Sequence, residues 1–271
     1  MATTMTLQEA ADHLGTHYMT VYRYVRLGRL PASKVGGTWE VDAADVAALQ
    51  EGSHENTKPR RSADWPQRLE TRLVAGDEAG SWGVIEAALS SGAEPGEIYM
   101  DLLAPALISL GTRWHTGDIS VAQEHLATAV AMRLIGRMGP RFARKGRTKG
   151  TVVVTTPPGE RHAIPSLMVS DLLRGAGFEA LDLGADVPAE TLGQIVGDFD
   201  GLVAVCISTT RINADEQVRR SIAATRQAAP DVPIFVGGTS IADADHANRL
   251  GADGWAKDGA GAVDLLLRVV A

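Results

Sequence analysis

The stretch "GTRWHTGDISVAQEH", at residues 111–125, gathers side chains that can bind a ligand or a metal. Trp114 offers a flat indole, His115 an imidazole, and Glu124 and His125 a carboxylate beside a second imidazole. An indole can lie over a flat ligand and exclude water, and a carboxylate can accept hydrogen bonds from hydroxyl groups. The stretch therefore predicts one face of a cofactor pocket. In the alternative interpretation, Trp114 packs in a helical core and Glu124 and His125 form a surface pair.

A second set of candidate side chains follows the strands of the C-terminal half. Strands are predicted at "TVVVTTP", "FEALDLGA", "DGLVAVCIST", "VPIFVGG" and "GWAKD", with helical segments between them. This alternation predicts an open, five-stranded parallel sheet with right-handed crossovers. Ligands of such sheets bind beyond the carboxyl ends of the strands. That rule selects three loops: "PPGERHAIP", "STTR" and "GGTS".

His162 is the most informative residue of these loops. It can be a metal ligand, because Glu160 lies two residues earlier and can hold the second ring nitrogen. A lone loop histidine is nevertheless more often polar surface. Residues 208–210 could simply cap a helix or turn, and residues 237–238 lack the spacing of a dinucleotide fingerprint. Each loop alone leaves both interpretations open.

The composition of the 271 residues is that of a globular protein, with 45% hydrophobic and 22% charged residues. No apolar run approaches the roughly 18 to 20 residues that cross a bilayer, and the N-terminus does not resemble a signal peptide. The single cysteine, Cys206, excludes an internal disulfide. We therefore expect a cytoplasmic protein without a membrane contact. Because the net charge is -7, any nucleic acid contact must come from a local patch.

The N-terminal residues 1–50 predict two short helices followed by a hairpin. Thr6 caps the first helix and Gly15 ends it, and the second helix spans residues 17–27. Val21 and Val25 are expected to face inward. The other face is left to Tyr18, Arg23, Tyr24 and Arg26. The glycine pair in "RLPASKVGGTWEV" predicts the turn of a β-hairpin wing, which completes a winged helix-turn-helix.

This segment resembles an excisionase/MerR-like winged helix-turn-helix head, with the character of the excisionase-like branch rather than of the MerR-like one. In that family the second helix enters the major groove and the wing touches the backbone, so double-stranded operator DNA is the implied partner. The implied DNA contacts are Thr20, Tyr22, Arg23, Arg26 and Lys34. The alternative is that these are solvated residues of an interaction domain. One such module contacts few phosphates, so a homo-oligomer is expected.

The rest of the chain divides by its pattern. Residues 51–63 are polar and lack an apolar period, which predicts a linker. Residues 64–147 predict a cap of four helices with short connections, a four-helix bundle. Residues 148–271 hold the alternating strands and helices. The predicted architecture is therefore multidomain.

The order of the three loops carries a second resemblance. A histidine loop, then Ser-x-Thr, then Gly-Gly, on a flavodoxin-like sheet preceded by a helical bundle, resembles the cobalamin-binding module of methionine synthase and methylmalonyl-CoA mutase. In that family the loop reads Asp-x-His-x-x-Gly, and its histidine is the lower ligand to cobalt. The resemblance implies this role for His162, oriented by Glu160, although Pro165 stands where the family has glycine. It also implies that the displaced nucleotide tail of the cofactor lies against Ser208, Thr210, Gly237 and Gly238.

The spacing of Trp114 and the pair Glu124 and His125 matches the Trp-x9-Glu-His signature of the CarH and LitR group of light-sensing, cobalamin-dependent transcriptional regulators. The resemblance implies that these residues enclose the 5'-deoxyadenosyl group of adenosylcobalamin, with Val121 as an apolar wall. It implies that His115 ligates cobalt after light has removed the adenosyl group.

The leading hypothesis is a non-enzymatic photoreceptor that regulates transcription. Photolysis of the cobalt–carbon bond would change its oligomeric state, as a dimer or tetramer, and its DNA binding. Two alternatives stay open. The chain could be a corrinoid methyl-carrier protein of a methyltransferase system, or its cobalamin site could have degenerated, an interpretation that rests on Pro165.

Overall fold

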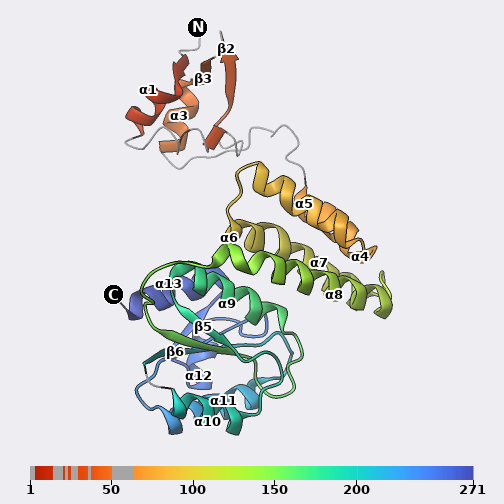
Figure 1. The fold of residues 1–271 in the computed structure, drawn as a ribbon, viewed down its shortest axis with the longest axis vertical. Helices are drawn as coiled ribbons and strands as arrows, with labels where there is room; N and C mark the ends of the chain where they lie inside the picture. Colours follow the sequence, from red (N-terminus) through yellow and green to blue (C-terminus); the bar gives the residue numbers. More distant parts are fainter. Residues whose placement is uncertain are drawn as a thin grey trace. The chain divides into compact units, whose positions relative to one another are not determined.

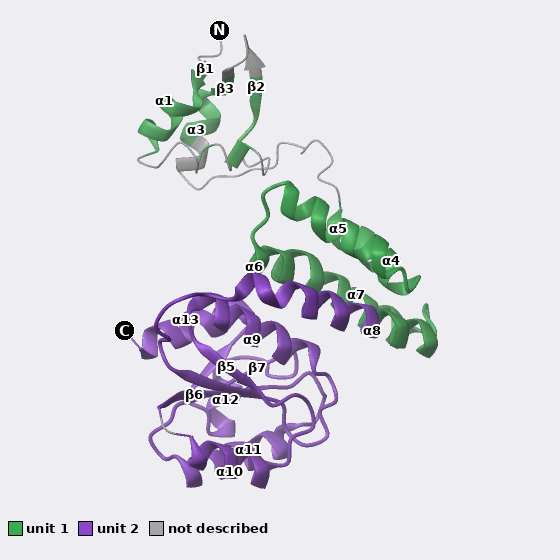
Figure 2. Ribbon diagram, viewed as in Figure 1, with its two compact units in different colours: residues 1–127 green, residues 128–271 purple. Residues whose placement is uncertain are grey.

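The computed structural model describes residues 4–14, 21, 24–25, 30–35, 38–50, 64–199 and 201–270. The chain forms two compact units, residues 1–127 and residues 128–271 (Figure 2). The elements of the N-terminal segment are β1 (Thr4–Thr6), α1 (Leu7–His13), β2 (Ala32–Val35), β3 (Thr38–Asp42) and α3 (Ala43–Gln50).

The predicted start of α1 is confirmed. The Thr6 hydroxyl accepts the backbone N–H of Glu9 at 3.3 Å, and the Glu9 carboxylate accepts the N–H of Thr6 at 2.7 Å. This reciprocal pair is a capping box. Strands β2 and β3 pair antiparallel, as the hairpin prediction requires, and β1 adds a third strand in the order β1-β3-β2. The strand β1 was not predicted, since three residues carry no readable period.

Three residues of the predicted second helix are described, and all three are helical. Val21 is completely buried and Val25 packs against the same apolar cluster, as predicted. The placement of Tyr24 on the opposite face was wrong, because its side chain also packs against this cluster. Residues three apart are neighbours on a helix surface, so Tyr24 shares the inner face with Val21.

All four helices predicted between residues 65 and 138 are present (Figure 1). They are α4 (Trp65–Val74), α5 (Glu78–Ser90), the composite α6 (Pro95–Glu97), η1 (Ile98–Leu103) and α7 (Ala104–Thr116), and α8 (Val121–Met138). The π-helical η1 was not predicted. There the Ala104 N–H bonds to the carbonyl of Tyr99, five residues earlier, directly before Pro105, which has no N–H to donate. Within the described part of the chain, no helix is long and apolar enough to cross a membrane.

The second unit confirms the flavodoxin-like fold. A short 3₁₀ turn, η2 (Gly139–Phe142), leads into a parallel sheet of five strands in the order β5-β4-β6-β7-β8. The strands are β4 (Thr151–Thr155), β5 (Glu179–Asp182), β6 (Leu202–Ser208), β7 (Ile234–Gly237) and β8 (Gly254–Ala256). Because the strands are parallel, their carboxyl ends meet at one edge, where the three candidate loops begin.

Helices cover both faces of this sheet (Figure 1). One face carries α9 (Ile164–Ala176) and α13 (Gly259–Val269), and the other carries α10 (Ala189–Asp198), α11 (Asp215–Ala228) and α12 (Ala244–Leu250). Val152 and Val154 of β4 enter one apolar cluster, and Val153 enters the other. This alternation is typical of a strand buried on both faces. Cys206 is buried here, and burial raises its pKa to about 12.

Candidate functional site

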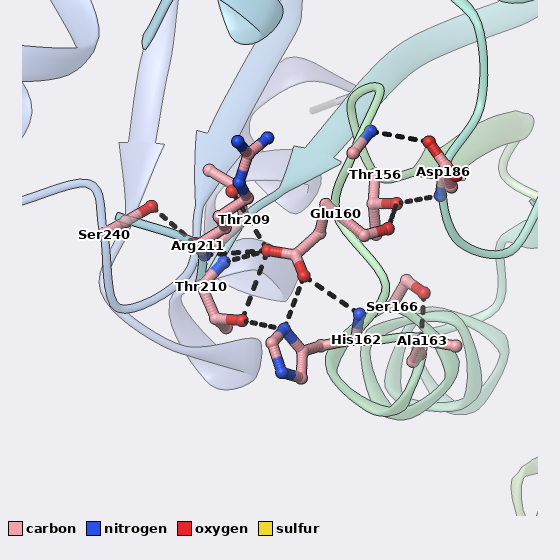
Figure 3. Close-up of polar contacts among 11 residues, drawn as sticks. Thr156, Glu160, His162, Ala163, Ser166, Asp186, Thr209, Thr210, Arg211 and Ser240 are labelled. Carbon is pink, nitrogen blue, oxygen red and sulfur yellow. Dashed lines mark hydrogen bonds and ion pairs between the residues drawn. The ribbon is translucent and has the colours of Figure 1, made fainter. Parts of the chain in front are cut away.

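Glu160 and His162 lie on the loop between β4 and α9, at the carboxyl edge of the sheet (Figure 3). The Glu160 side chain is buried, with 1% of its surface exposed. Its Oε1 accepts the backbone N–H of His162 at 2.9 Å and lies 2.5 Å from the ring Nδ1. The carboxylate therefore holds both the backbone and the ring of His162, as the position of Glu160 two residues earlier predicts for an orienting residue.

The second oxygen of Glu160 binds the loop that follows β6. Its Oε2 accepts the N–H groups of Thr210 at 2.6 Å and Arg211 at 2.8 Å, and the hydroxyl of Thr209 at 3.1 Å. Burial by itself would raise the pKa of Glu160, but the backbone hydrogen bonds outweigh it and lower the pKa to about 2. The side chain is therefore a carboxylate at neutral pH, and it joins two of the three candidate loops.

The His162 ring is set up to offer one nitrogen. Its Nδ1 lies 2.9 Å from the Thr210 hydroxyl as well as beside the Glu160 carboxylate. In a neutral imidazole, a carboxylate at that distance favours the tautomer with the proton on Nδ1, in which Nε2 is the acceptor. The side chain is 68% exposed. An exposed Nε2 on a ring held from behind is the arrangement found in metal-ligating histidines.

The donor set fits a metal that brings its own equatorial ligands. Within the described ranges, no three His, Cys, Asp or Glu side chains gather to hold a bare metal ion. A single exposed imidazole at the carboxyl edge of the sheet would instead suit a metal such as the cobalt of cobalamin, which could take one ligand from the protein. The residues present therefore fit cobalamin.

Pro165 does not disturb the histidine loop. It lies in the first turn of α9, where a backbone N–H has no partner within the helix and proline is well tolerated. The Ser166 hydroxyl donates to the carbonyl of Ala163 at 2.8 Å and closes the same turn. The departure from the family's glycine therefore gives no support to a degenerated site.

A further anchor of the loop was missed in the sequence. The Thr156 hydroxyl donates to the Glu160 carbonyl at 3.2 Å and accepts the N–H of Asp186 at 2.9 Å. The Asp186 carboxylate in turn accepts the N–H of Gly159 at 2.6 Å (Figure 3). Asp186 has a φ of 57°, a region that aspartate tolerates better than most residues. A turn signal in "GADVP" could have indicated it.

Gly237 and Gly238, at the end of β7, lie so close to neighbouring backbone atoms that neither position has room for a side chain. Gly238 has a φ of 96°, and a Cβ there would collide with the backbone of Thr209. A Cβ on Gly237 would lie 2.7 Å from the carbonyl of Ala256. Ser208, the last residue of β6, pairs with Gly237 in the sheet. These residues therefore form one compact edge together with the Glu160 loops.

In the first unit, the candidates of the opening stretch lie at one end of two consecutive helices. Trp114 and His115 belong to the last turn of α7, and Val121, Glu124 and His125 to the first turns of α8. The Trp114 side chain is 48% exposed, so the interpretation as helical core is wrong. Val121 is 58% exposed, and Nδ1 of His125 lies 2.8 Å from Oε2 of Glu124.

Two features fix this end of the helices, and neither was predicted. Arg113 pairs with the buried Glu70 of α4 at 2.6 Å, immediately before Trp114. Gly117 then ends α7 with a φ of 83°, and the Ser120 hydroxyl accepts the N–H of Gln123 at 3.3 Å at the start of α8. An ion pair between Arg113 and a buried carboxylate of α4 can be recognised only once the helices are placed.

The candidate DNA contacts are not tested by the structure. Thr20, Tyr22, Arg23 and Arg26 lie outside the described residues. Lys34 is part of β2, but its side chain also lies outside the described set. The described helices and strands therefore support the winged helix-turn-helix fold, while the residues predicted to contact DNA stay a prediction.

Comparison with known families gives the three parts their identities. A helix-turn-helix domain family matches residues 4–54. Two families described as B12 binding domain match residues 65–138 and residues 150–266. The predicted head, helical cap and cobalamin-binding sheet are confirmed at this level.

Among known proteins, the chain is 31% identical over 203 residues to the HTH-type transcriptional repressor CarH of Myxococcus xanthus. The match covers 73% of this chain but only 64% of CarH, less than two thirds of its length. The chain is also 31% identical over 187 residues to trimethylamine corrinoid protein 2 of Methanosarcina mazei, covering 65% of this chain and 83% of that protein.

The solved structure of the Methanosarcina barkeri monomethylamine corrinoid protein superposes with a TM-score of 0.62 at 20% identity, covering 74% of this chain and 96% of that one. This likeness concerns the fold alone. The sequence matches and the His162 site together identify the molecule as a cobalamin-binding member of the corrinoid protein family that carries an N-terminal helix-turn-helix DNA-binding domain.

Proposed function

We propose that this chain is an adenosylcobalamin-dependent photoreceptor that regulates transcription, and not a catalytic enzyme. The observation that carries the proposal is the exposed Trp114 at the end of α7, beside the start of α8, in a chain that joins a helix-turn-helix domain to cobalamin-binding domains. A methyl group needs no large indole above it, whereas an adenosyl group offers a flat surface of matching size.

In this proposal the second unit supplies the protein ligand to cobalt and the surface for the nucleotide tail. His162 would ligate cobalt through Nε2, and Glu160 orients the ring through its Nδ1. The nucleotide tail of the cofactor lies against the edge formed by Ser208, Thr210, Gly237 and Gly238. Because Gly238 admits no Cβ, no side chain projects from this part of the edge, and the tail can approach the backbone there.

The first unit supplies the residues proposed for the adenosyl group. Trp114 and Val121 present apolar surface that excludes water from the adenosyl group, and Glu124 and His125 supply polar atoms for its ribose and base. When bound, adenosylcobalamin supplies a cobalt–carbon bond that light can break. His115 would supply a second imidazole for cobalt in the lit state. The pair Glu70 and Arg113 keeps the Trp114 turn in place.

The DNA-binding head acts through Thr20, Tyr22, Arg23, Arg26 and Lys34, and a dimer or tetramer places several heads on one operator. The free-energy difference needed between the dark and the lit state is small, because a tenfold change in DNA affinity corresponds to about 1.4 kcal/mol. Gel filtration of the adenosylcobalamin-loaded protein, in the dark and after green light, tests the switch. Elution of different assemblies is expected, and identical elution volumes would remove the assembly switch.

A corrinoid methyl-carrier is the second candidate, favoured by the likeness to trimethylamine corrinoid protein 2. It accounts for His162 but leaves the helix-turn-helix domain without a role. A binding competition between methylcobalamin and adenosylcobalamin separates the two. Preference for methylcobalamin would favour the carrier.

A further inference from the structure

A basic cleft lies in the second unit at the edge of the sheet opposite His162. It has a volume of about 390 Å³ and lies where the chain enters β4 and β5, at their amino ends. Its walls come from the segment before β4 and from the turn between α9 and β5. The lining residues include Arg144, Lys145, Arg147, Lys149, Arg174 and Glu179.

The charge of this cleft departs from that of the chain. Residues 141–149 read "RFARKGRTK", with five cationic and no acidic residues, in a protein whose net charge is -7. Glu179 is the only acidic residue of the lining, and its carboxylate accepts the Thr151 hydroxyl at 3.3 Å. The cleft is therefore a local patch of positive charge.

Some of these cations are already engaged within the fold. Arg174 donates to the Asp171 carboxylate at 2.8 Å and to the Ala180 carbonyl at 2.9 Å. The Lys149 ammonium lies 5.7 Å from the centre of the Phe178 ring. These contacts give Arg174 and Lys149 structural roles.

Three other cations are exposed and have no such role. Arg144, Lys145 and Arg147 make no hydrogen bond or ion pair with any residue that the structure describes. Their segment is nevertheless tied down at its end. The Lys149 N–H donates to the Gly177 carbonyl at 2.9 Å, and the Thr148 hydroxyl donates to the Gly150 carbonyl at 3.1 Å. Three free cations on an anchored segment need little further ordering to bind an anion.

We propose that this cleft binds the phosphodiester backbone of double-stranded DNA and adds a contact beyond the helix-turn-helix domain. Exposed lysine and arginine side chains in succession suit phosphates spaced along a strand, and such contacts carry affinity without reading sequence. The inference rests on the proposed function as a DNA-binding regulator. It also supplies phosphate contacts that a single small head lacks.

The test uses the full chain, loaded with adenosylcobalamin in the dark, and a fluorescent duplex of random sequence titrated at several KCl concentrations. The cleft variant combines Arg144→Gln, Lys145→Gln and Arg147→Gln. The matched control combines Arg249→Gln, Lys257→Gln and Arg268→Gln, which removes the same charge from exposed positions elsewhere on the unit. Equal melting temperatures and cobalamin spectra show that both variants are folded.

The magnitude of the slope of log affinity against log salt is expected to fall by about 2.7 in the cleft variant, since each of the three lost phosphate contacts contributes roughly 0.9. In the control the slope is expected to stay near that of the wild type. A wild-type slope and affinity in the cleft variant would overturn the cleft proposal and leave the head intact. Failure of the wild type to bind any duplex would overturn the DNA-binding function as well. Potassium phosphate that displaces DNA better than KCl of equal ionic strength, from wild type only, would assign the cleft to free phosphate compounds instead.

Discussion

Glu160 and His162 are joined twice, because one carboxylate oxygen accepts the backbone N–H of His162 at 2.9 Å and lies 2.5 Å from Nδ1 of its ring. The direction of the ring is therefore fixed through the backbone as well as through the side chain. The same carboxylate binds the loop after β6 through Thr210 and Arg211. Any change at Glu160 should thus alter both the stability of the sheet edge and the axial ligand.

Glu160→Gln is expected to lower the free energy of unfolding by about 2 kcal/mol, because an amide NH₂ cannot accept the N–H groups that now reach one carboxylate oxygen. The cobalamin spectrum in the dark should also shift toward that of His162→Ala. Urea unfolding and absorption spectra measure the two effects. Glu190→Gln, at an exposed position of α10, is the control and should change neither. An unchanged free energy of unfolding in Glu160→Gln would show that the hydrogen bonds of the Glu160 carboxylate do not stabilise the fold.

The pH dependence of stability follows from the lowered pKa of Glu160. The folded pKa is about 2 against an ordinary value of 4.5, so the stabilisation is complete above about pH 5 and is lost as the pH falls toward 2. The full amount corresponds to about 3.5 kcal/mol, at about 1.4 kcal/mol per pKa unit. Unfolding free energies of wild type and Glu160→Gln should therefore converge as the pH falls below 4.5. A constant difference across that range would contradict the assignment.

Gly238→Ala separates a steric requirement from a conformational one. Its Cβ would meet the Thr209 backbone at a φ of 96°, whereas Gly184 has a φ of 76° and open space around it. Gly184→Ala should cost about 1 kcal/mol for the left-handed conformation alone. Gly238→Ala should cost clearly more and weaken cobalamin retention. Equal thermal destabilisation of the two variants would mean that the loops after β6 and β7 move apart freely.

Trp114→Ala tests the upper side of the proposed pocket. Because the side chain is 48% exposed, the fold should lose little stability. Affinity for adenosylcobalamin should fall, while affinity for methylcobalamin should change little, since only the adenosyl group reaches the indole. Competition binding in the dark measures the ratio, and Phe199→Ala, an exposed aromatic of the second unit, is the control. Equal loss for both cobalamins would favour the carrier function.

Much of this fold was predictable because its elements have strong periods. The β4 run "TVVVT" and the Thr6 capping box are local features that can be read from a few residues. The parallel sheet follows from the alternation of strands and helices along the chain. The partner of His162 was also predictable, since Glu160 is two residues away. The ion pair of Glu70 and Arg113 was not, because it joins residues 43 positions apart that only the packed helices bring together.

The position of Tyr24 was misjudged because aromatic residues with a polar tip suit both a core and a surface. For the glycine pair, the sequence interpretation considered only a ligand, and that role stays a prediction. The pair's need to avoid the Thr209 backbone depends on a contact between two loops that no local pattern contains.

The most direct measurement is the absorption spectrum of the purified protein with adenosylcobalamin, in the dark and after green illumination, for wild type, His162→Ala and His115→Ala. The account predicts retained cofactor and a light-driven change in the wild type. His162→Ala should alter the dark spectrum and His115→Ala only the lit one. Retained cofactor with no change on illumination, or a dark spectrum that is the same without His162, would contradict it.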